Sequence, residues 1–292
     1  MLDSINPDVV AGLGLSNYGF YAAVCGRRPL AVSAYGSDVL LAPKESLRLK
    51  WMVKYAIKKA DLITADAEVL KKEIMRLGGE ESKVVVQPLG VDDVFLSVNR
   101  SREFARKDRY TVLSYRSLEP LYNIELILQA FPLVVEQTAK VKLIIAGEGS
   151  QRSKLEEMAS QLGIENKTQF MGAVAHDELP KVLESADVYV SMSLSDSTSV
   201  SLLEAMAAGV FPIVSDIPGN REWVENRVNG FTVPTDDPRL LAKRIVQAVE
   251  DDSLRRSAAQ KNLEIITAKA RWNENIDRLE AAFLRLAGDK RS

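Results

Sequence analysis

The chain has 292 residues, of which 46% are hydrophobic and 27% charged, and this ordinary globular composition provides a core large enough for two domains. A net charge of −2 argues against nucleic acid as the main partner, the single cysteine excludes a disulfide framework, and the single histidine nearly excludes histidine-based zinc sites and Ser-His-Asp triads. Because no apolar run approaches the ~20 residues of a membrane span and residues 1–7 lack the blocks of a signal peptide, we expect a cytoplasmic protein.

Residues 1–98 alternate short apolar runs with helical periods, a pattern that predicts a partial Rossmann-like domain. Strands are expected at 8–11, 30–33, 62–64 and 83–87, and the main helices at 46–59 and 67–77. The stretch 88–109 combines Gly90, two aspartates and then many basic residues. This composition is typical of an interdomain linker.

From residue 108 onward the alternation of strands and helices is regular. Strands are expected at 110–115, 141–146, 169–171, 187–192, 210–215 and 231–233. The helices after them are expected to start near residues 123, 152, 177, 199, 221 and 238. Continuous apolar strands separated by helices predict a parallel sheet covered on both faces, a doubly wound α/β domain over residues 99–270. Residues 271–292 contain the last predicted helix, 272–286.

A loop rich in hydroxyl groups precedes the fourth helix of this domain. It runs from Ser191 to Ser199, and the helix after it contains Glu204 among apolar residues. At the carboxyl end of a parallel strand, such a loop borders the crevice where open α/β sheets bind ligands, and the helix N-terminus suits a diphosphate. Glu204 needs a partner, which paired ribose hydroxyls would supply. The alternative is a capped helix with a half-buried glutamate satisfied by backbone groups.

The segment from Asp196 to Gly209 resembles the signature of the family-4 retaining glycosyltransferases, which have the GT-B fold of two Rossmann-like domains. In that signature two acidic residues frame the donor loop, and Glu204-Ala-Met-Ala-Ala-Gly209 matches its second half closely. The resemblance implies that Glu204 holds the ribose hydroxyls of the nucleotide and that Asp196 hydrogen-bonds hydroxyls of the transferred sugar. Asp196 stands where the family usually has Glu, and Ser197 and Ser199 stand where it usually has glycines.

A second match lies at the start of the same domain. Residues 113–123 are similar to the family's first loop, in which an Arg and a Lys six residues later clamp the diphosphate. Arg116 fits the first role, and Tyr122 occupies the Lys position. The leaving group must then depend on Arg116, the helix dipole and the Tyr122 hydroxyl. The alternative for Arg116 is a surface ion pair with Glu119.

Weaker matches extend the resemblance from about Pro7 to the last helix. Gly147 resembles part of the family's Gly-x-Gly turn, residues 171–174 its base-facing loop, and residues 88–95 its Asn-Gly-Val-Asp hinge with Leu89 in place of Asn. Tyr35 stands where the family's His-Gly-x-Asp loop has His, and a phenol does not ionise near neutral pH. The resemblance assigns catalysis to Arg116, Asp196 and Glu204, and donor binding to Gly147, Ala173, Val174, Ser197, Thr198, Ser199, Val200, Tyr122 and Tyr35.

Three other features have a functional and a plain interpretation. Residues 12–17 resemble a dinucleotide fingerprint but lack its third glycine and an acidic ribose partner at the usual distance. His176 precedes an expected N-cap at Asp177, so we expect it at the surface rather than in catalysis. The helix from Ser46 to Lys59 is basic and amphipathic, which indicates either a membrane-surface contact or the solvated face of an ordinary Rossmann helix.

The resemblance therefore implies a GT-B-like enzyme that transfers a sugar from a nucleotide diphosphate sugar to a glycan or lipid-linked acceptor with retention. No Asp-x-Asp pair occurs, so no metal is expected, and no cofactor beyond the donor substrate is expected. The expected location is the cytoplasm, with the inner membrane face as the alternative. The alternative function, favoured by Tyr35 and Tyr122, is a non-catalytic glycosyltransferase-like binding subunit.

The N-terminal domain is expected to be incomplete, with the last helix packed back on it. Residues 7–11 resemble the fourth strand of the family's N-terminal domain, so the strand at 8–11 would form an open edge. We expect either a shortened form of a longer protein or a homo-oligomer that pairs through this edge.

Overall fold

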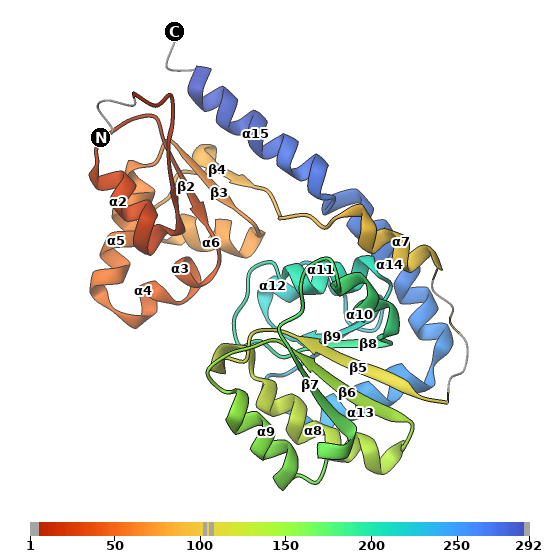
Figure 1. The fold of residues 1–292 in the computed structure, drawn as a ribbon. Helices are drawn as coiled ribbons and strands as arrows, with labels where there is room; N and C mark the ends of the chain where they lie inside the picture. The colour runs from red at the N-terminus through yellow and green to blue at the C-terminus, as the bar shows by residue number, and fades with distance from the viewer. Residues whose placement is uncertain (1–5, 102–103, 105–107, 289–292) are drawn as a thin grey trace. The chain divides into compact units, whose positions relative to one another are not determined.

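The computed structural model describes residues 6–101, 104 and 108–288, which form two compact units (Figure 1). The first unit contains the described part of 1–90 together with 195–198 and 272–288, and the second contains the described part of 91–194 and 199–271. Each unit is built on one parallel sheet. The predicted α/β class with two parallel-sheet domains is therefore confirmed.

The first unit has a four-stranded sheet in the order β1-β2-β3-β4. The strands are β1 (Val10–Leu13), β2 (Leu30–Ala34), β3 (Leu62–Ala65) and β4 (Val84–Val86). Its helical elements are η1 (Gly14–Tyr18), α2 (Gly19–Val24), α3 (Ser37–Leu40), α4 (Ala42–Glu45), α5 (Leu47–Lys59), α6 (Glu68–Arg76), η2 (Glu81–Lys83) and α15 (Trp272–Gly288). Val32 and Ile63 face a buried cluster that includes α5 and α6. On the opposite face, Ala31 and Leu62 pack against Ala282 of α15. Because successive strand residues point to opposite faces, α15 provides the second layer of this unit.

The second unit has a six-stranded parallel sheet in the order β10-β9-β8-β5-β6-β7. The strands are β5 (Tyr110–Tyr115), β6 (Val141–Ala146), β7 (Thr168–Gly172), β8 (Val188–Ser191), β9 (Phe211–Ser215) and β10 (Phe231–Val233). Their bounds agree with the expected strands to within about two residues. The chain winds outward from β5 in one direction and from β8 in the other, so the order reverses between these two neighbours. This is the doubly wound topology that the sequence predicts.

Helices cover both faces of the second sheet (Figure 1). Val112 and Leu143 face the core beneath α8 (Ile124–Gln137), α9 (Arg152–Gln161) and α13 (Pro238–Glu250). Their neighbours Leu113 and Ile144 face the core beneath α7 (Asp93–Ser101), α10 (Leu179–Ser185), α11 (Val200–Ala207) and α14 (Asp252–Lys269). Short helical turns complete the unit: η3 (Pro120–Tyr122), η4 (Glu165–Lys167) and α12 (Pro218–Arg221). No helix in the described part of the chain combines the length and apolar character needed to cross a membrane.

The stretch 88–109 is not the plain linker that its composition indicates. It contains α7, whose Phe95, Leu96 and Val98 are buried in the core of the second unit. These apolar residues have helical spacing, but the glycine and aspartates before them and the basic residues after them obscured the signal.

Two predicted helix starts also differ from the structure. The helix α10 begins at Leu179, so its N-cap is Glu178 rather than Asp177. The helix α12 ends at Arg221, where a helix was expected to begin, and Pro218 occupies its first turn. Proline favours the first turn because its missing N–H has no partner there.

Candidate functional site

The carboxyl ends of β5, β6 and β8 bring several of the predicted site residues together in the second unit. Arg116 directly follows β5, Gly147 directly follows β6, and Ser199 caps the helix that follows β8. The strands β5 and β8 are the neighbours at which the strand order reverses. Open α/β sheets bind ligands at such a switch point, so this edge is the candidate site.

A cavity of about 240 Å³ opens at this edge. It is lined by Tyr115, Arg116, Ser117, Ala146, Gly147, Glu148, Ala173, Val174 and Leu179. Three of the predicted donor contacts, Gly147, Ala173 and Val174, therefore lie in one cavity. Apolar side chains such as Leu179 line it together with the charged Arg116 and Glu148, a combination suited to a flat base linked to polar groups.

Gly147 allows the loops after β5 and β6 to lie in direct contact. Its φ is +137°, and a Cβ there would come within 2.2 Å of the carbonyl oxygen of Arg116. Its N–H donates to the carbonyl of Gly172 at 2.7 Å, which joins the turn to the end of β7. A side chain would fill the space beside Arg116, so only glycine fits.

Arg116 is held at the N-terminus of α11. Its Nη1 donates to the Ser201 hydroxyl at 2.9 Å and also to the Ser199 hydroxyl. Ser199 caps the helix by accepting the Leu202 N–H at 3.3 Å. A guanidinium beside the N-terminus of a helix is unfavourable in isolation, because its charge and the positive end of the helix dipole repel each other. The arrangement favours an anion at this position.

Tyr122, in the position where the family has a lysine, packs against Arg116. The guanidinium carbon lies 4.4 Å from the centre of the Tyr122 ring, which is a cation–π geometry. Glu119, the alternative partner weighed for Arg116, accepts instead from the backbone N–H of Ser150 at 2.7 Å and from its hydroxyl. Tyr122 therefore orients the guanidinium but supplies no second cation.

Glu204 is a buried carboxylate, with 4% of its residue surface exposed. Its Oε2 lies 3.2 Å from the Tyr115 hydroxyl, and its Oε1 lies 3.4 Å from Nε2 of His176. Burial raises the pKa of Glu204, and the neighbouring His176 and Tyr115 oppose that rise. The alternative interpretation was a glutamate satisfied by backbone groups. Here two side chains, Tyr115 and His176, contact the carboxylate.

Tyr115 and Ser201 connect Glu204 to Arg116. The Tyr115 hydroxyl donates to the Ser201 carbonyl, and the Ser201 hydroxyl lies 2.8 Å from the Tyr189 hydroxyl and 2.9 Å from Arg116. Burial, and then the charge of Glu204, raise the pKa of Tyr115 well above its ordinary value. One hydrogen-bonded network therefore contains both predicted residues, Arg116 and Glu204, and Val200 begins the helix that carries it.

The remaining predicted residues belong to the first unit. Asp196, Ser197 and Thr198 lie in the segment 195–198, and Tyr35 follows β2 with half of its surface exposed. The carboxylate of Asp196 accepts the Ser197 N–H at 3.0 Å. Ser197 and Thr198 are buried and contact Asp66, a residue that the sequence reasoning did not single out.

Two buried carboxylates occupy the carboxyl edge of the first sheet. Asp38 accepts the N–H groups of Leu15 at 2.7 Å and of Tyr35 at 3.0 Å. Asp66 accepts the Ser197 hydroxyl at 3.0 Å through Oδ2, while its Oδ1 has no hydrogen-bond partner among the described residues. Burial above all, with the charges of Asp196 and Asp38, raises the pKa of Asp66 to about 7.

His176 lies at the surface, as expected, but its contact with a predicted site residue was not foreseen. It was expected at the surface, and 61% of its side chain is indeed exposed, but its Nε2 contacts Glu204. The signal that could have found it is topological. The loop after β7 opens at the same edge of the sheet as the loops after β5 and β8, so its side chains can reach Glu204.

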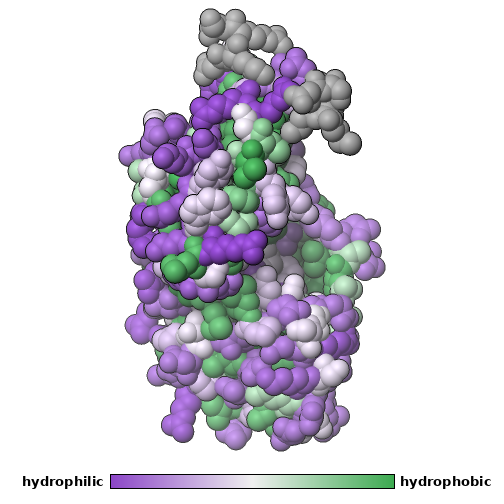
Figure 2. Space-filling view, turned by 90° about the vertical axis from the view of Figure 1, so that its left-hand side faces the viewer, coloured by the Kyte–Doolittle hydropathy of each residue, from purple (hydrophilic) through white to green (hydrophobic). Residues whose placement is uncertain are grey.

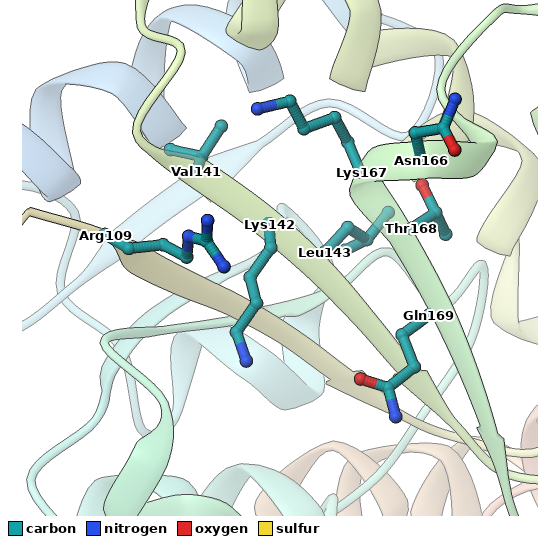
Figure 3. Close-up of a pocket in the computed structure, with 8 residues that line it drawn as sticks. All are labelled: Arg109, Val141, Lys142, Leu143, Asn166, Lys167, Thr168 and Gln169. Atoms are coloured by element: carbon teal, nitrogen blue, oxygen red, sulfur yellow. The ribbon is translucent and has the colours of Figure 1, made fainter.

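A second cavity of the same unit lies away from this site. This cavity has a volume of about 200 Å³. Figure 3 shows the residues that line it, among them Arg109, Lys142 and Lys167. These residues stand at or just before the beginnings of β5, β6 and β7. The cavity is therefore at the amino end of the strands, opposite to the edge where Arg116 and Glu204 lie.

Comparison with known proteins identifies the family. Residues 97–264, more than half of the chain, match the family model described as glycosyl transferases group 1. The chain belongs to this family. Residues 1–67 match the model described as glycosyl transferase 4-like, in agreement with the resemblance found at the donor loop.

Curated relatives support the same family. The chain is 31% identical over 214 residues to an uncharacterized glycosyltransferase of Methanocaldococcus jannaschii, which covers 70% of this chain and 55% of that protein. It is 32% identical over 180 residues to the phosphatidyl-myo-inositol mannosyltransferase of Mycobacterium tuberculosis, which covers 60% of this chain and 47% of the relative. The chain thus spans about half the length of these two relatives.

Solved structures share the fold. The crystal structure of Anabaena HepE in complex with UDP has a TM-score of 0.82 at 19% identity, covering 97% of this chain and 80% of that one. Sucrose-phosphate synthase from Thermosynechococcus elongatus has a TM-score of 0.85 at 16% identity, covering 99% and 76%. At these identities the likeness establishes the fold, which is that of the GT-B glycosyltransferases.

Proposed function

We propose that this glycosyltransferase-family chain moves a sugar from a nucleotide diphosphate sugar to a glycan or lipid-linked acceptor, with retention and without a metal ion. The observation that carries the proposal is the pairing of a positive pole with a buried carboxylate in one unit. Arg116 lies at the N-terminus of α11, and Glu204 lies inside the same helix. A diphosphate would bind at the positive pole, and the hydroxyls of a ribose would bind to the carboxylate.

The cavity supports one direction for the bound nucleotide. The base would occupy the space lined by Ala173, Val174 and Gly147. The ribose would then reach Glu204, and the diphosphate would reach Arg116, because Ser201 and Tyr115 join these two residues in one network. HepE, a structural neighbour, is known in complex with UDP, so a UDP-sugar is the first donor to test.

The chemical step in this proposal is a displacement on one face of the sugar. The bond from the anomeric carbon to the diphosphate oxygen breaks, and a bond from that carbon to the acceptor oxygen forms on the same face. The acceptor's proton moves to the departing diphosphate oxygen. Negative charge grows on the diphosphate, so Arg116 and the helix dipole would lower the barrier by electrostatic stabilisation.

Asp196 and Tyr35 have proposed roles toward the sugars. Asp196 would accept hydrogen bonds from hydroxyls of the transferred sugar, and the buried Ser197 and Thr198 would hold the loop that carries it. Tyr35 replaces the family's histidine and would offer a neutral hydroxyl. The mannosyltransferase relative is named for a phosphatidyl-inositol acceptor, which supports a lipid-linked acceptor as one candidate here.

A donor panel tests the proposed function. UDP-, GDP- and ADP-sugars are incubated with the chain, with and without a chelator, and release of the nucleotide diphosphate is measured. We expect turnover of one nucleotide class that is unchanged by the chelator. If a donor binds but none is turned over, the result would favour the non-catalytic binding subunit that Tyr35 and Tyr122 indicate. Loss of turnover on chelation would contradict metal independence.

A membrane contact through α5 is a further part of the proposal. Leu47 and Trp51 of α5 are 85% and 57% exposed, and the Trp51 ring packs 5.5 Å from that of Phe20. Arg48 and Lys54 are exposed on the same helix. Figure 2 looks at the side on which α2 and α5 lie in Figure 1 and shows apolar residues among hydrophilic ones in its upper part. Exposed aromatic and cationic side chains together suit an anionic membrane surface at the cytoplasmic face.

Vesicle sedimentation tests this contact. Vesicles of phosphatidylglycerol should bind the chain, vesicles of phosphatidylcholine should not, and the double change Leu47→Ser and Trp51→Ser should abolish binding. Equal binding to both vesicle types would reject an anionic membrane contact.

The last part of the proposal is that the chain self-associates through β1. This strand is an edge of the first sheet, and its Leu13 is 54% exposed. Unpaired edge strands can pair with a second copy. Light scattering of the wild type and of Ala11→Pro, which cannot donate at the edge, tests it.

A further inference from the structure

His176 contacts the carboxylate to which the proposed function assigns the ribose. Its Nε2 lies 3.4 Å from Oε1 of Glu204 and 4.0 Å from a carboxylate oxygen of Asp92. The ring also packs edge-on against Phe95, with centroids 5.6 Å apart and planes at 86°. Phe95 is fully buried, so it provides a rigid support for an otherwise exposed imidazole.

The other neighbour of Glu204 is a weak hydrogen-bond donor toward it. A phenol carries one proton, and the Tyr115 hydroxyl donates to the Ser201 carbonyl while lying 3.2 Å from Oε2 of Glu204. That single proton cannot fully serve both acceptors. The imidazole, whose Nε2 lies 3.4 Å from Oε1, is the second side chain from which the carboxylate can accept a hydrogen bond.

The chemistry of a ribose requires an ionised carboxylate at this position. Two neighbouring hydroxyls donate to two oxygens of one carboxylate, whereas a protonated carboxyl group offers one acceptor oxygen fewer. Burial of Glu204 favours its protonated form. His176 and Tyr115 both oppose this effect of burial on the pKa of Glu204, and His176 does so from the Oε1 side.

We propose that His176 is a positioning residue for nucleotide recognition, whose Nε2–H holds Oε1 of Glu204 so that the carboxylate accepts from the paired ribose hydroxyls. This inference rests on the proposed function and names a second residue in the same site. It assigns the imidazole to the tautomer protonated at Nε2, because that nitrogen faces both Glu204 and Asp92. His176 touches the carboxylate and is not assigned a contact with the reacting atoms.

The exposure of His176 makes the test practical. With 61% of the side chain in solvent, His176→Ala removes little packing and should leave the fold intact. His176→Gln keeps an N–H donor at a similar reach and serves as the conservative variant. Asp177→Ala is the matched control, because Asp177 is the next residue of the same loop and is also exposed.

The experiment is calorimetric titration with whichever of UDP, GDP and ADP the wild type binds most tightly. We expect His176→Ala to weaken binding by roughly tenfold, the effect of losing one charge-assisted hydrogen bond. His176→Gln should recover most of the affinity, and Asp177→Ala should change nothing. The 2′,3′-dideoxy form of the same nucleotide should bind wild type and His176→Ala equally, because it lacks the hydroxyls that Glu204 receives.

The outcomes separate this inference from the proposed function. If Glu204→Gln weakens binding but His176→Ala does not, the role of His176 is overturned and the proposed ribose contact stands. If neither variant weakens binding, or no nucleotide binds, the proposed function fails with it. An equal loss for the ribo and dideoxy nucleotides would overturn positioning through the ribose. The double variant should lose no more affinity than Glu204→Gln alone, since both changes remove one interaction.

Discussion

The carboxyl edges of the two sheets carry different sets of charged side chains. Both have parallel sheets whose carboxyl edges carry the polar loops. In the second unit that edge holds the Arg116 guanidinium at a helix N-terminus. In the first it holds two buried carboxylates, Asp38 and Asp66. A cation therefore accompanies the buried carboxylate Glu204 in the second unit, whereas the edge of the first unit has two buried carboxylates close together.

The strongest way to break this contrast is to remove the positive charge of the second unit. Arg116→Ala should lower kcat by about 10²–10³ with a smaller change in KM, because charge on the diphosphate grows in the transition state. Steady-state kinetics with the preferred donor provides the measurement. Arg109→Ala is the control, since that arginine lies at the amino end of the strands. A raised KM at unchanged kcat would assign Arg116 to ground-state binding instead.

The next largest effect is expected at the carboxylate of the second unit. Glu204→Gln keeps size and polarity but loses the charge, which should cost about 1.5–3 kcal/mol in nucleotide diphosphate binding and abolish measurable transfer. Calorimetry measures the first and product formation the second. Glu178→Gln, at an exposed glutamate before α10, should behave as wild type. Wild-type affinity in Glu204→Gln would remove the ribose assignment.

The carboxylates of the first unit predict a pH-dependent stability. With a folded pKa of about 7 against an ordinary value of 3.8, native Asp66 holds its proton where the unfolded chain has lost it. The native state thus binds more protons between these values, and stability falls as pH rises through that window.

Asp66→Asn mimics the protonated form and should remove this dependence. Its stability gain over wild type should be near zero at pH 4 and on the order of 1–3 kcal/mol at pH 8. Thermal or urea unfolding at both pH values measures it, and Asp177→Asn serves as the control. A gain that is the same at both pH values would show that ionisation of Asp66 is not the cause.

The smallest expected effect sharpens the contrast instead of breaking it. Tyr122→Lys adds the cation that the family has beside Arg116 and should tighten nucleotide diphosphate binding by about 0.5–1 kcal/mol. Tyr122→Phe keeps the ring over the guanidinium but removes the hydroxyl, so its loss of affinity measures what that hydroxyl contributes to donor binding. If the lysine variant binds no more tightly, Tyr122 does not occupy the position that the resemblance assigns to it.

The second sheet could be predicted almost completely, because most of its strands are largely apolar runs separated by long helical periods. The helix α7 was missed because a hinge-like Gly90-Val-Asp92 precedes it, although Phe95, Leu96 and Val98 have helical spacing. Arg116 and Glu204 were found through the family signature. Their contact through Ser201 could not be, since it joins residues more than eighty positions apart.

His176 and Asp66 show where sequence reasoning ends. Nothing in the order of residues 172–178 indicates that the imidazole lies against Glu204, because that contact depends on how two loops at one sheet edge approach each other. Asp66 resembles an ordinary polar residue after a strand. Its raised pKa comes from burial and from the proximity of Asp38 and Asp196, which are properties of the folded chain only.

The packing of α15 against the first sheet has a consequence for synthesis on the ribosome. Ala31 and Leu62 meet Ala282, so one face of the first sheet is covered by a helix made more than two hundred residues later. The second unit is translated between them and can fold first. During that interval the nascent first unit exposes an apolar sheet face, which is a surface that chaperones recognise and that aggregates form from. The helix α15 therefore completes a unit whose strands are translated long before it, and a stop codon before residue 272 would leave Ala31 and Leu62 without this cover.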